Sequence, residues 1–207
     1  MKSLEKKIKS FDIVIFDLDD TIYPQKNYDN PALMEVSKYL EKIIKLDKKK
    51  IFKLLRKMKK IRRGSPPKLI FNSLLKNLNI QNKKKIILKC ITLFQNYNCL
   101  ELKNSKSLKN LLKRTSKKKL LFLVTNGFKK RQFNKIHNLG IKQYFRKIFI
   151  LDGIKKELKP SISDVSYLSN LINKNQNLKS VYIGDNKDTD YKFANNLKIK
   201  FIFFQFP

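Results

Sequence analysis

Hydrophobic residues follow two different periods along this chain. Short, continuous apolar runs are typical of strands that are buried on both faces of a parallel sheet. Five such runs lie at 12–17, 120–125, 147–151, 180–185 and 200–204. Segments with apolar residues at helical spacing lie at about 105–116, 128–139, 162–174 and 189–197. Because strands alternate with helices, the pattern predicts an α/β fold around a parallel sheet.

A long helical segment separates the first predicted strand from the second. Apolar residues recur at helical spacing across 28–99, and the sequence RRGSPP at 62–67 interrupts the pattern. A segment of this length is far longer than a single crossover between neighbouring strands needs. We therefore expect an α/β core formed by 1–27 and 100–207, with 28–99 inserted as a helical subdomain.

The length and the cysteine content restrict the class of protein. The 207 residues suffice for one domain with a sizeable core, or for a core with a smaller insertion. No apolar run approaches the roughly 18 residues of a membrane span, and the basic N-terminus lacks the features of a signal peptide. Cys90 and Cys99 form no metal or redox motif. We expect a cytoplasmic protein without a membrane partner, and the sequence does not indicate an oligomeric state.

The formal net charge of +32 allows two interpretations. One is a basic nucleic-acid-binding protein. The other is codon bias, since 42 lysines against six arginines and two alanines are the composition of an AT-rich coding sequence. The lysines are spread along the whole chain and form no single basic tail. We favour codon bias and do not expect nucleic acid to be the main partner.

Polar residues gather where the predicted strands end. Asp17, Asp19 and Asp20 follow the first strand within four positions, Thr125 ends the second and Asp185 ends the fourth. Ligands of open parallel sheets bind beyond the carboxyl ends of the strands. Carboxylates this close repel one another, and each is costly to remove from water. The cluster therefore predicts a site that holds a cation.

Four short motifs follow four of the strands in order: DLDDT at 17–21, TNG at 125–127, KP at 159–160 and GDNKDTD at 184–190. In type, order and placement they resemble the motifs of the haloacid dehalogenase-like (HAD) hydrolase superfamily, in its phosphatase branch. The resemblance covers essentially the whole chain outside 28–99. It implies a Rossmann-like parallel core, with that segment inserted as an α-helical cap between the first and second motifs.

The resemblance also implies an activity. Members of this branch are Mg²⁺-dependent hydrolases of phosphate monoesters that act through an aspartyl-phosphate. Asp17 would be the nucleophile, and Asp19 the general acid for the leaving alcohol and then the base for water. We expect neighbouring carboxylates to raise the pKa of Asp19, as an acid requires. Lys159 would neutralise the phosphoryl charge and pair with Asp17.

The same resemblance implies how the phosphoryl group is held. The Thr125 side chain and the backbone amides of Asn126 and Gly127 would bind its oxygens. A small phosphorylated metabolite is the substrate that we expect.

The cofactor implied is Mg²⁺, a hard cation that chooses oxygen ligands. Asp17 and Asp185 would supply carboxylates, and Asp19 its backbone carbonyl. Asp190 would assist the metal through water or orient Lys159.

Several alternatives stay open. A 5′-nucleotidase or a phosphomutase of the same superfamily would share these motifs, and a basic nucleic-acid-binding protein could use the same scaffold. Asp19 argues against a dehalogenase, because a halide leaving group needs no acid.

Two further features, an arginine pair and one lysine, depart from what composition and family lead one to expect. Arg62 and Arg63 are adjacent in a chain that is poor in arginine, and arginine binds anions in two places where lysine cannot. We hypothesise that at least one contacts the substrate away from the scissile phosphate. Lys198 occupies a helix end where family members often have glycine, which puts local stability in doubt.

Overall fold

The computed structural model describes residues 2–61, 66–80, 83–100, 102 and 106–206. The chain divides into two compact units. One contains Met1–Gln25 and Glu101–Pro207, and the other contains Lys26–Leu100. Their assignment as catalytic core and cap stays a prediction. Within the described residues, no helix is both long and apolar enough to span a bilayer.

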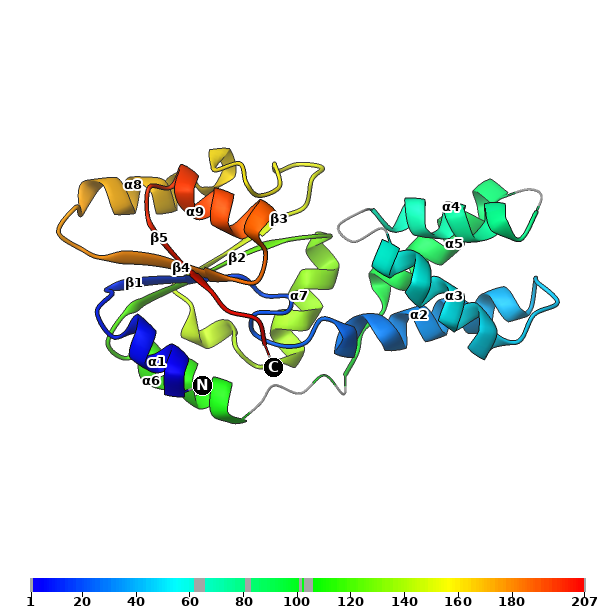
Figure 1. Cartoon of the computed structure of the whole chain (residues 1–207), viewed down its shortest axis with the longest axis horizontal. Helices are drawn as coiled ribbons and strands as arrows, with labels where there is room; N and C mark the ends of the chain where they lie inside the picture. Colours follow the sequence, from blue (N-terminus) through cyan, green and yellow to red (C-terminus); the bar gives the residue numbers. More distant parts are fainter. Residues whose placement is uncertain (1, 62–65, 81–82, 101, 103–105, 207) are drawn as a thin grey trace. The chain divides into compact units, whose positions relative to one another are not determined.

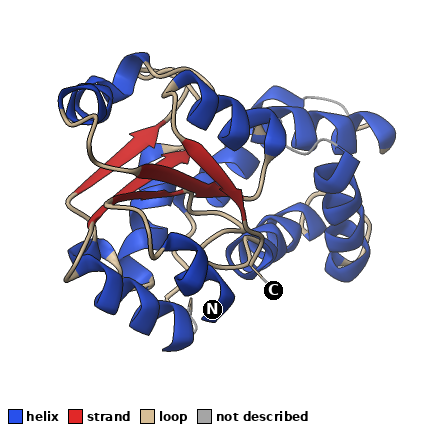
Figure 2. Cartoon of the chain, turned by 60° about the vertical axis from the view of Figure 1, so that its left-hand side comes forward, coloured by secondary structure: helices blue, strands red, loops and turns tan. Residues whose placement is uncertain are grey.

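The first unit contains a five-stranded parallel sheet. Its strands are β1 Ile13–Phe16, β2 Leu120–Asn126, β3 Lys147–Leu151, β4 Ser180–Gly184 and β5 Lys200–Phe203. They lie in the order β3-β2-β1-β4-β5, and each pairs in parallel with its neighbour. Figure 2 shows the strands side by side, with helices on both faces of the sheet. The predicted α/β fold is confirmed, and each predicted run matches one strand to within one residue at either end.

Helices cover both faces of this sheet (Figure 1). They are α1 Lys2–Ile8, α6 Lys106–Ser116, α7 Lys129–Asn138, η1 Lys142–Tyr144, η2 Ser163–Val165, α8 Ser166–Lys174, η3 Lys187–Tyr191 and α9 Lys192–Asn196. One face of the sheet packs against α8 and α9 through a buried apolar cluster that includes Ile15, Val124, Leu168 and Phe193. The three central strands, β1, β2 and β4, are buried on both faces, which explains why they are apolar without alternation.

The second unit is helical. It consists of α2 Lys26–Glu41, α3 Lys48–Ile61, α4 Pro67–Asn77 and α5 Lys83–Asn96. A buried cluster that includes Leu33, Leu55, Phe71 and Phe94 joins the four helices. The unit therefore has a hydrophobic core of its own, which is what allows it to be inserted into the loop after β1.

The strand order positions the site. The chain goes from the central strand β1 to β2 and β3 on one side and then returns to β4 and β5 on the other. Phe16 is in register with Leu123 of β2 and with Ile183 of β4. The residues that follow these positions therefore meet at the carboxyl edge of the sheet, where the strand order reverses.

Lys198 has a left-handed backbone conformation, with φ of 55°. Ile199 donates its N–H to Ala194 O at 3.1 Å, and Lys198 donates to Asn195 O at 2.9 Å. These two bonds form the Schellman motif that ends α9, in which glycine is usual. The departure seen in the sequence therefore places a lysine at a position of backbone strain.

We predict that Lys198→Gly stabilises the protein by about 1 kcal/mol, because a left-handed residue with a Cβ costs about 1–2 kcal/mol and glycine recovers most of it. Urea unfolding measures this change. The control is Lys192→Gly in α9, an exposed helical position where glycine should destabilise by about 1 kcal/mol. Destabilisation in both variants would contradict the prediction.

Candidate active site

A buried ammonium group connects the first, third and fourth motifs. Lys159 Nζ lies 2.6 Å from Asp17 Oδ1 and 2.7 Å from Asp190 Oδ1. It also lies 2.9 Å from Tyr182 Oη and 3.3 Å from Val124 O. Lys159 is 5% exposed and Asp190 is 1% exposed, so the charges balance one another with little help from water. Removing Lys159 would leave Asp190 buried without its cation, at a cost of about 3–5 kcal/mol.

The second motif positions the backbone of Lys159. The Lys159 N–H donates to Asn126 Oδ1 at 2.9 Å, and Asn126 Nδ2 donates to Lys159 O at 3.4 Å. Asn126 is the last residue of β2, so these two bonds attach the loop that carries Lys159 to a rigid strand end. This side-chain function of Asn126 was not predicted, since the sequence suggested only its backbone amide.

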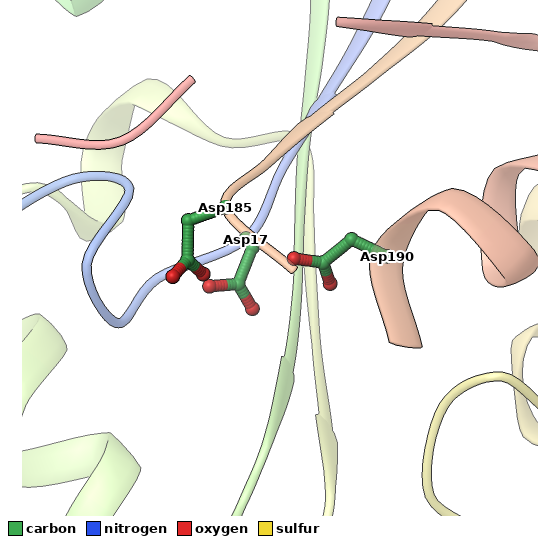
Figure 3. Close-up of side chains that lie close together, drawn as sticks. All are labelled: Asp17, Asp185 and Asp190. Carbon is green, nitrogen blue, oxygen red and sulfur yellow. The ribbon is translucent and has the colours of Figure 1, made fainter. Parts of the chain in front are cut away.

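Three carboxylates meet at the carboxyl edge of the sheet (Figure 3). Ligand oxygens of Asp17, Asp185 and Asp190 all lie within 4.8 Å of one another. Gly184 makes this approach possible, because a Cβ there would lie 2.3 Å from Asp190 Oδ2. Hard oxygen donors suit a divalent cation such as Mg²⁺, which binds directly to one or two protein carboxylates and keeps several waters that a further carboxylate can contact. The donor set therefore fits the metal that the sequence predicts.

Crowding of charge perturbs the titration of this cluster. Burial, opposed by the Lys159 charge and reinforced by Asp190, raises the pKa of Asp17 to about 8. The Lys159 pKa is raised above its ordinary value, because Asp17 and Asp190 outweigh the effect of burial. Burial and the Asp190 charge raise the pKa of Tyr182 well above its usual range, so that its hydroxyl stays protonated. A cation at the carboxylates would favour the ionised form of Asp17.

Asp19 has a different environment, and the expected direction of its pKa is wrong. Burial alone would raise the pKa of Asp19, but Lys135 and hydrogen bonds from Tyr23 and Gln132 lower it below the ordinary value. Lys135 Nζ lies 2.8 Å from both carboxylate oxygens. Lys135 and these hydrogen bonds together outweigh burial, where we expected neighbouring carboxylates to raise the pKa.

Thr125 and Gly127 lie at the same edge of the sheet. Thr125 is buried, and its Oγ1 accepts a hydrogen bond from Gln132 Nε2 at 2.6 Å, so its own hydroxyl proton remains to be donated. The Gly127 N–H donates to Leu151 O at 2.8 Å and so extends the pairing of β2 with β3. In this geometry the amide of Gly127 is engaged within the protein, which does not support its assignment to phosphoryl binding.

Sequence reasoning missed four residues of the site. Tyr182, Tyr23, Gln132 and Lys135 all contact the predicted aspartates or Lys159. Only Gln132 and Lys135 carried a signal: they are three residues apart on the helix that follows the second motif, and they therefore share a face. Arg62 and Arg63 lie outside the described residues, so their role stays a prediction.

The family model for haloacid dehalogenase-like hydrolases matches residues 11–198. The chain belongs to this family. The match spans both the four motifs and the helical unit, so it includes every residue of the site described above. No curated protein sequence matches the chain.

Solved structures agree with the HAD assignment at the level of the fold. A phosphatase-like protein from Clostridium difficile superimposes with a TM-score of 0.68 and 19% identity, covering 94% of this chain and 85% of that one. The magnesium-bound HAD-hydrolase YfnB from Bacillus subtilis gives a TM-score of 0.64 and 17% identity, covering 93% and 88%. A β-phosphoglucomutase-like protein from Thermotoga maritima gives 0.62 and 22%, covering 92% and 83%.

The raised pKa of Asp17 predicts how the metal-free protein responds to pH. Between the ordinary Asp pKa of 3.8 and about 8, the folded state holds a proton that the unfolded state has lost. The free energy of unfolding therefore falls as the pH rises through this window. We predict that Asp17→Asn raises the melting temperature in EDTA, and more so at pH 8 than at pH 5.

Added Mg²⁺ should reverse the order of the two melting temperatures, so that wild type becomes the more stable protein. A ligand that binds only the folded state stabilises it by mass action. Wild type should gain thermal stability with Mg²⁺, and Asp17→Asn should gain much less because its amide oxygen is uncharged and a weaker ligand than the carboxylate. Thermal unfolding with and without Mg²⁺ measures both effects. An equal Mg²⁺ shift in both proteins would exclude Asp17 as a ligand.

Proposed function

We propose that this HAD protein is a Mg²⁺-dependent phosphomonoester hydrolase that acts on a small phosphorylated metabolite through an aspartyl-phosphate. The observation that carries the proposal is the contact of the buried Lys159 ammonium with Asp17, beside two further carboxylates. A carboxylate nucleophile repels an anionic phosphate unless cations neutralise both. The site combines a fixed ammonium group with a donor set suited to a divalent cation.

In the first step, a carboxylate oxygen of Asp17 attacks phosphorus and the bond from phosphorus to the leaving oxygen breaks. Asp19 gives a proton to that oxygen, so that the product leaves as an alcohol. Lys159 balances the negative charge that the phosphoryl group brings to Asp17. Thr125 has a hydroxyl proton to donate to a phosphoryl oxygen.

In the second step, water attacks phosphorus, and Asp19 accepts the proton that water loses. The bond from phosphorus to Asp17 breaks, which frees inorganic phosphate and restores the carboxylate. The ionised Asp19 described above suits this step. Since the first step needs its protonated form, the lowered pKa makes protonation of the leaving group the more demanding of the two roles.

Asp17 and Asp185, with the backbone carbonyl of Asp19, would hold the Mg²⁺, and Asp190 would assist while it orients Lys159. Bound there, the ion would neutralise charge shared between carboxylate and phosphate oxygens. YfnB, a structural relative, was solved with magnesium bound, which supports the same choice of ion for this chain.

A 5′-nucleotidase and a phosphomutase remain the alternatives within the superfamily. The Thermotoga maritima relative described as a β-phosphoglucomutase shares the fold. A mutase would return the phosphoryl group to a second hydroxyl of its substrate, whereas a hydrolase gives it to water. Release of inorganic phosphate in proportion to substrate consumed distinguishes the two.

We predict phosphate release from a panel of phosphorylated sugars, nucleotides and three-carbon acids in the presence of Mg²⁺. EDTA should abolish this activity and added Mg²⁺ should restore it, because the carboxylates alone repel the substrate. A malachite-green assay measures the phosphate. Undiminished turnover in EDTA would contradict the metal requirement.

We predict that Asp17→Asn and Asp19→Asn fail in different ways. Asp17→Asn should abolish turnover and the covalent intermediate, since an amide is not a nucleophile here. Asp19→Asn should lower kcat by about 10²–10⁴-fold for glycerol phosphate, and much less for p-nitrophenyl phosphate, whose leaving group needs no proton. Steady-state kinetics with both substrates tests this, and equal losses would rule out the acid role.

A further inference from the structure

Lys135 is a buried ammonium group that the proposed steps do not use. It is 1% exposed and lies on α7, the helix that Figure 1 labels. Its Nζ is 2.8 Å from Asp19 Oδ1 and 2.8 Å from Asp19 Oδ2. Contact with both oxygens restricts the rotation of the carboxylate, which a contact with one oxygen would leave free.

Gln132 attaches the same carboxylate to the sheet. Its Nε2 lies 3.0 Å from Asp19 Oδ2, 2.6 Å from Thr125 Oγ1 and 3.0 Å from Asn126 O. Gln132 and Lys135 are three residues apart and so share one face of α7. The Tyr23 hydroxyl donates to Asp19 Oδ1 as well. Asp19 is therefore held by two residues of α7 and by Tyr23 of its own turn, and Gln132 connects it to the end of β2.

Burial of Lys135 is unusual for this chain. Among the lysines whose burial the structure describes, Lys135 and Lys159 are the two that are buried. Lysine is rarely buried unless it is paired. Each of the two pairs with a different aspartate of the first motif, Lys159 with Asp17 and Lys135 with Asp19. Since well-packed apolar residues often replace buried ion pairs without loss of stability, stability alone gives no reason for Lys135.

We propose that Lys135 is a positioning residue for the reaction: it acts through Asp19 and, with Gln132, fixes that carboxylate in the orientation that proton transfer requires. This inference rests on the proposed function, because it assumes that Asp19 transfers the proton. It adds Lys135 to the site as a second lysine besides Lys159 of the third motif. It assigns Lys135 no contact with the substrate.

A double-mutant cycle tests the proposal. Lys135→Met keeps the apolar stem and removes the charge, and it is combined with Asp19→Asn. The kcat and KM for glycerol phosphate and p-nitrophenyl phosphate are measured with Mg²⁺ for wild type, both single variants and the double variant. Lys130→Met is the matched control, since Lys130 lies exposed on the same helix.

We expect Lys135→Met to lower kcat for glycerol phosphate by about tenfold or more with little change in KM, as loss of an interaction used in the transition state does. In the Asp19→Asn background the same substitution should cost less than about twofold, because residues that act as a unit are not additive. Lys135→Arg should recover part of the loss, and Lys130→Met should leave kcat unchanged.

Two outcomes overturn the inference. Equal fold-losses from Lys135→Met in the two backgrounds would show that Lys135 acts independently of Asp19, and leave the proposed function standing. A wild type that hydrolyses neither ester would overturn the proposed function and this inference together. If Lys135→Met does not unfold cooperatively, Gln132→Leu takes its place in the cycle with the same expected non-additivity.

Discussion

The buried contact of Lys159 with Asp17 and Asp190 is the interaction on which the rest of the site depends. Its charges come from three segments of the chain and are almost wholly removed from water. Such a cluster is stable only when each charge has partners at short distance. The strand order brings the segments together, Gly184 lets Asp190 approach, and Asn126 holds the backbone of Lys159.

The two aspartates of the first motif show how neighbouring residues acquire different chemistry. Asp17 and Asp19 are two positions apart, yet the pKa of one is raised and that of the other is lowered. Asp17 shares the Lys159 ammonium group with Asp190, so burial is the larger effect and raises the pKa of Asp17. Asp19 has Lys135 against both oxygens. The different cations around them therefore shift the two pKa values in opposite directions, in line with the proposed roles of Asp17 as nucleophile and Asp19 as proton carrier.

The sheet and the helical unit contribute to this protein in different ways. The carboxyl edge of the sheet holds every described residue to which we assign a part in the chemistry. The helical unit has a separate core and carries none of them. Structural relatives below 25% identity share the fold while their descriptions name different reactions, so the reaction follows from the site and not from the fold.

The sequence by itself determined the five strands, the helices between them and the order of the four motifs, because apolar period and motif spacing are local properties. It also indicated that Lys198 replaces a helix-ending glycine, and the left-handed backbone agrees. Only the tertiary structure decided the partners of Asp19, since Lys135 is 116 positions away and is one of 42 lysines. The same holds for the engaged amide of Gly127 and for Tyr182 beside Lys159. Electrostatic environment depends on distances in space, which no local pattern of residues encodes.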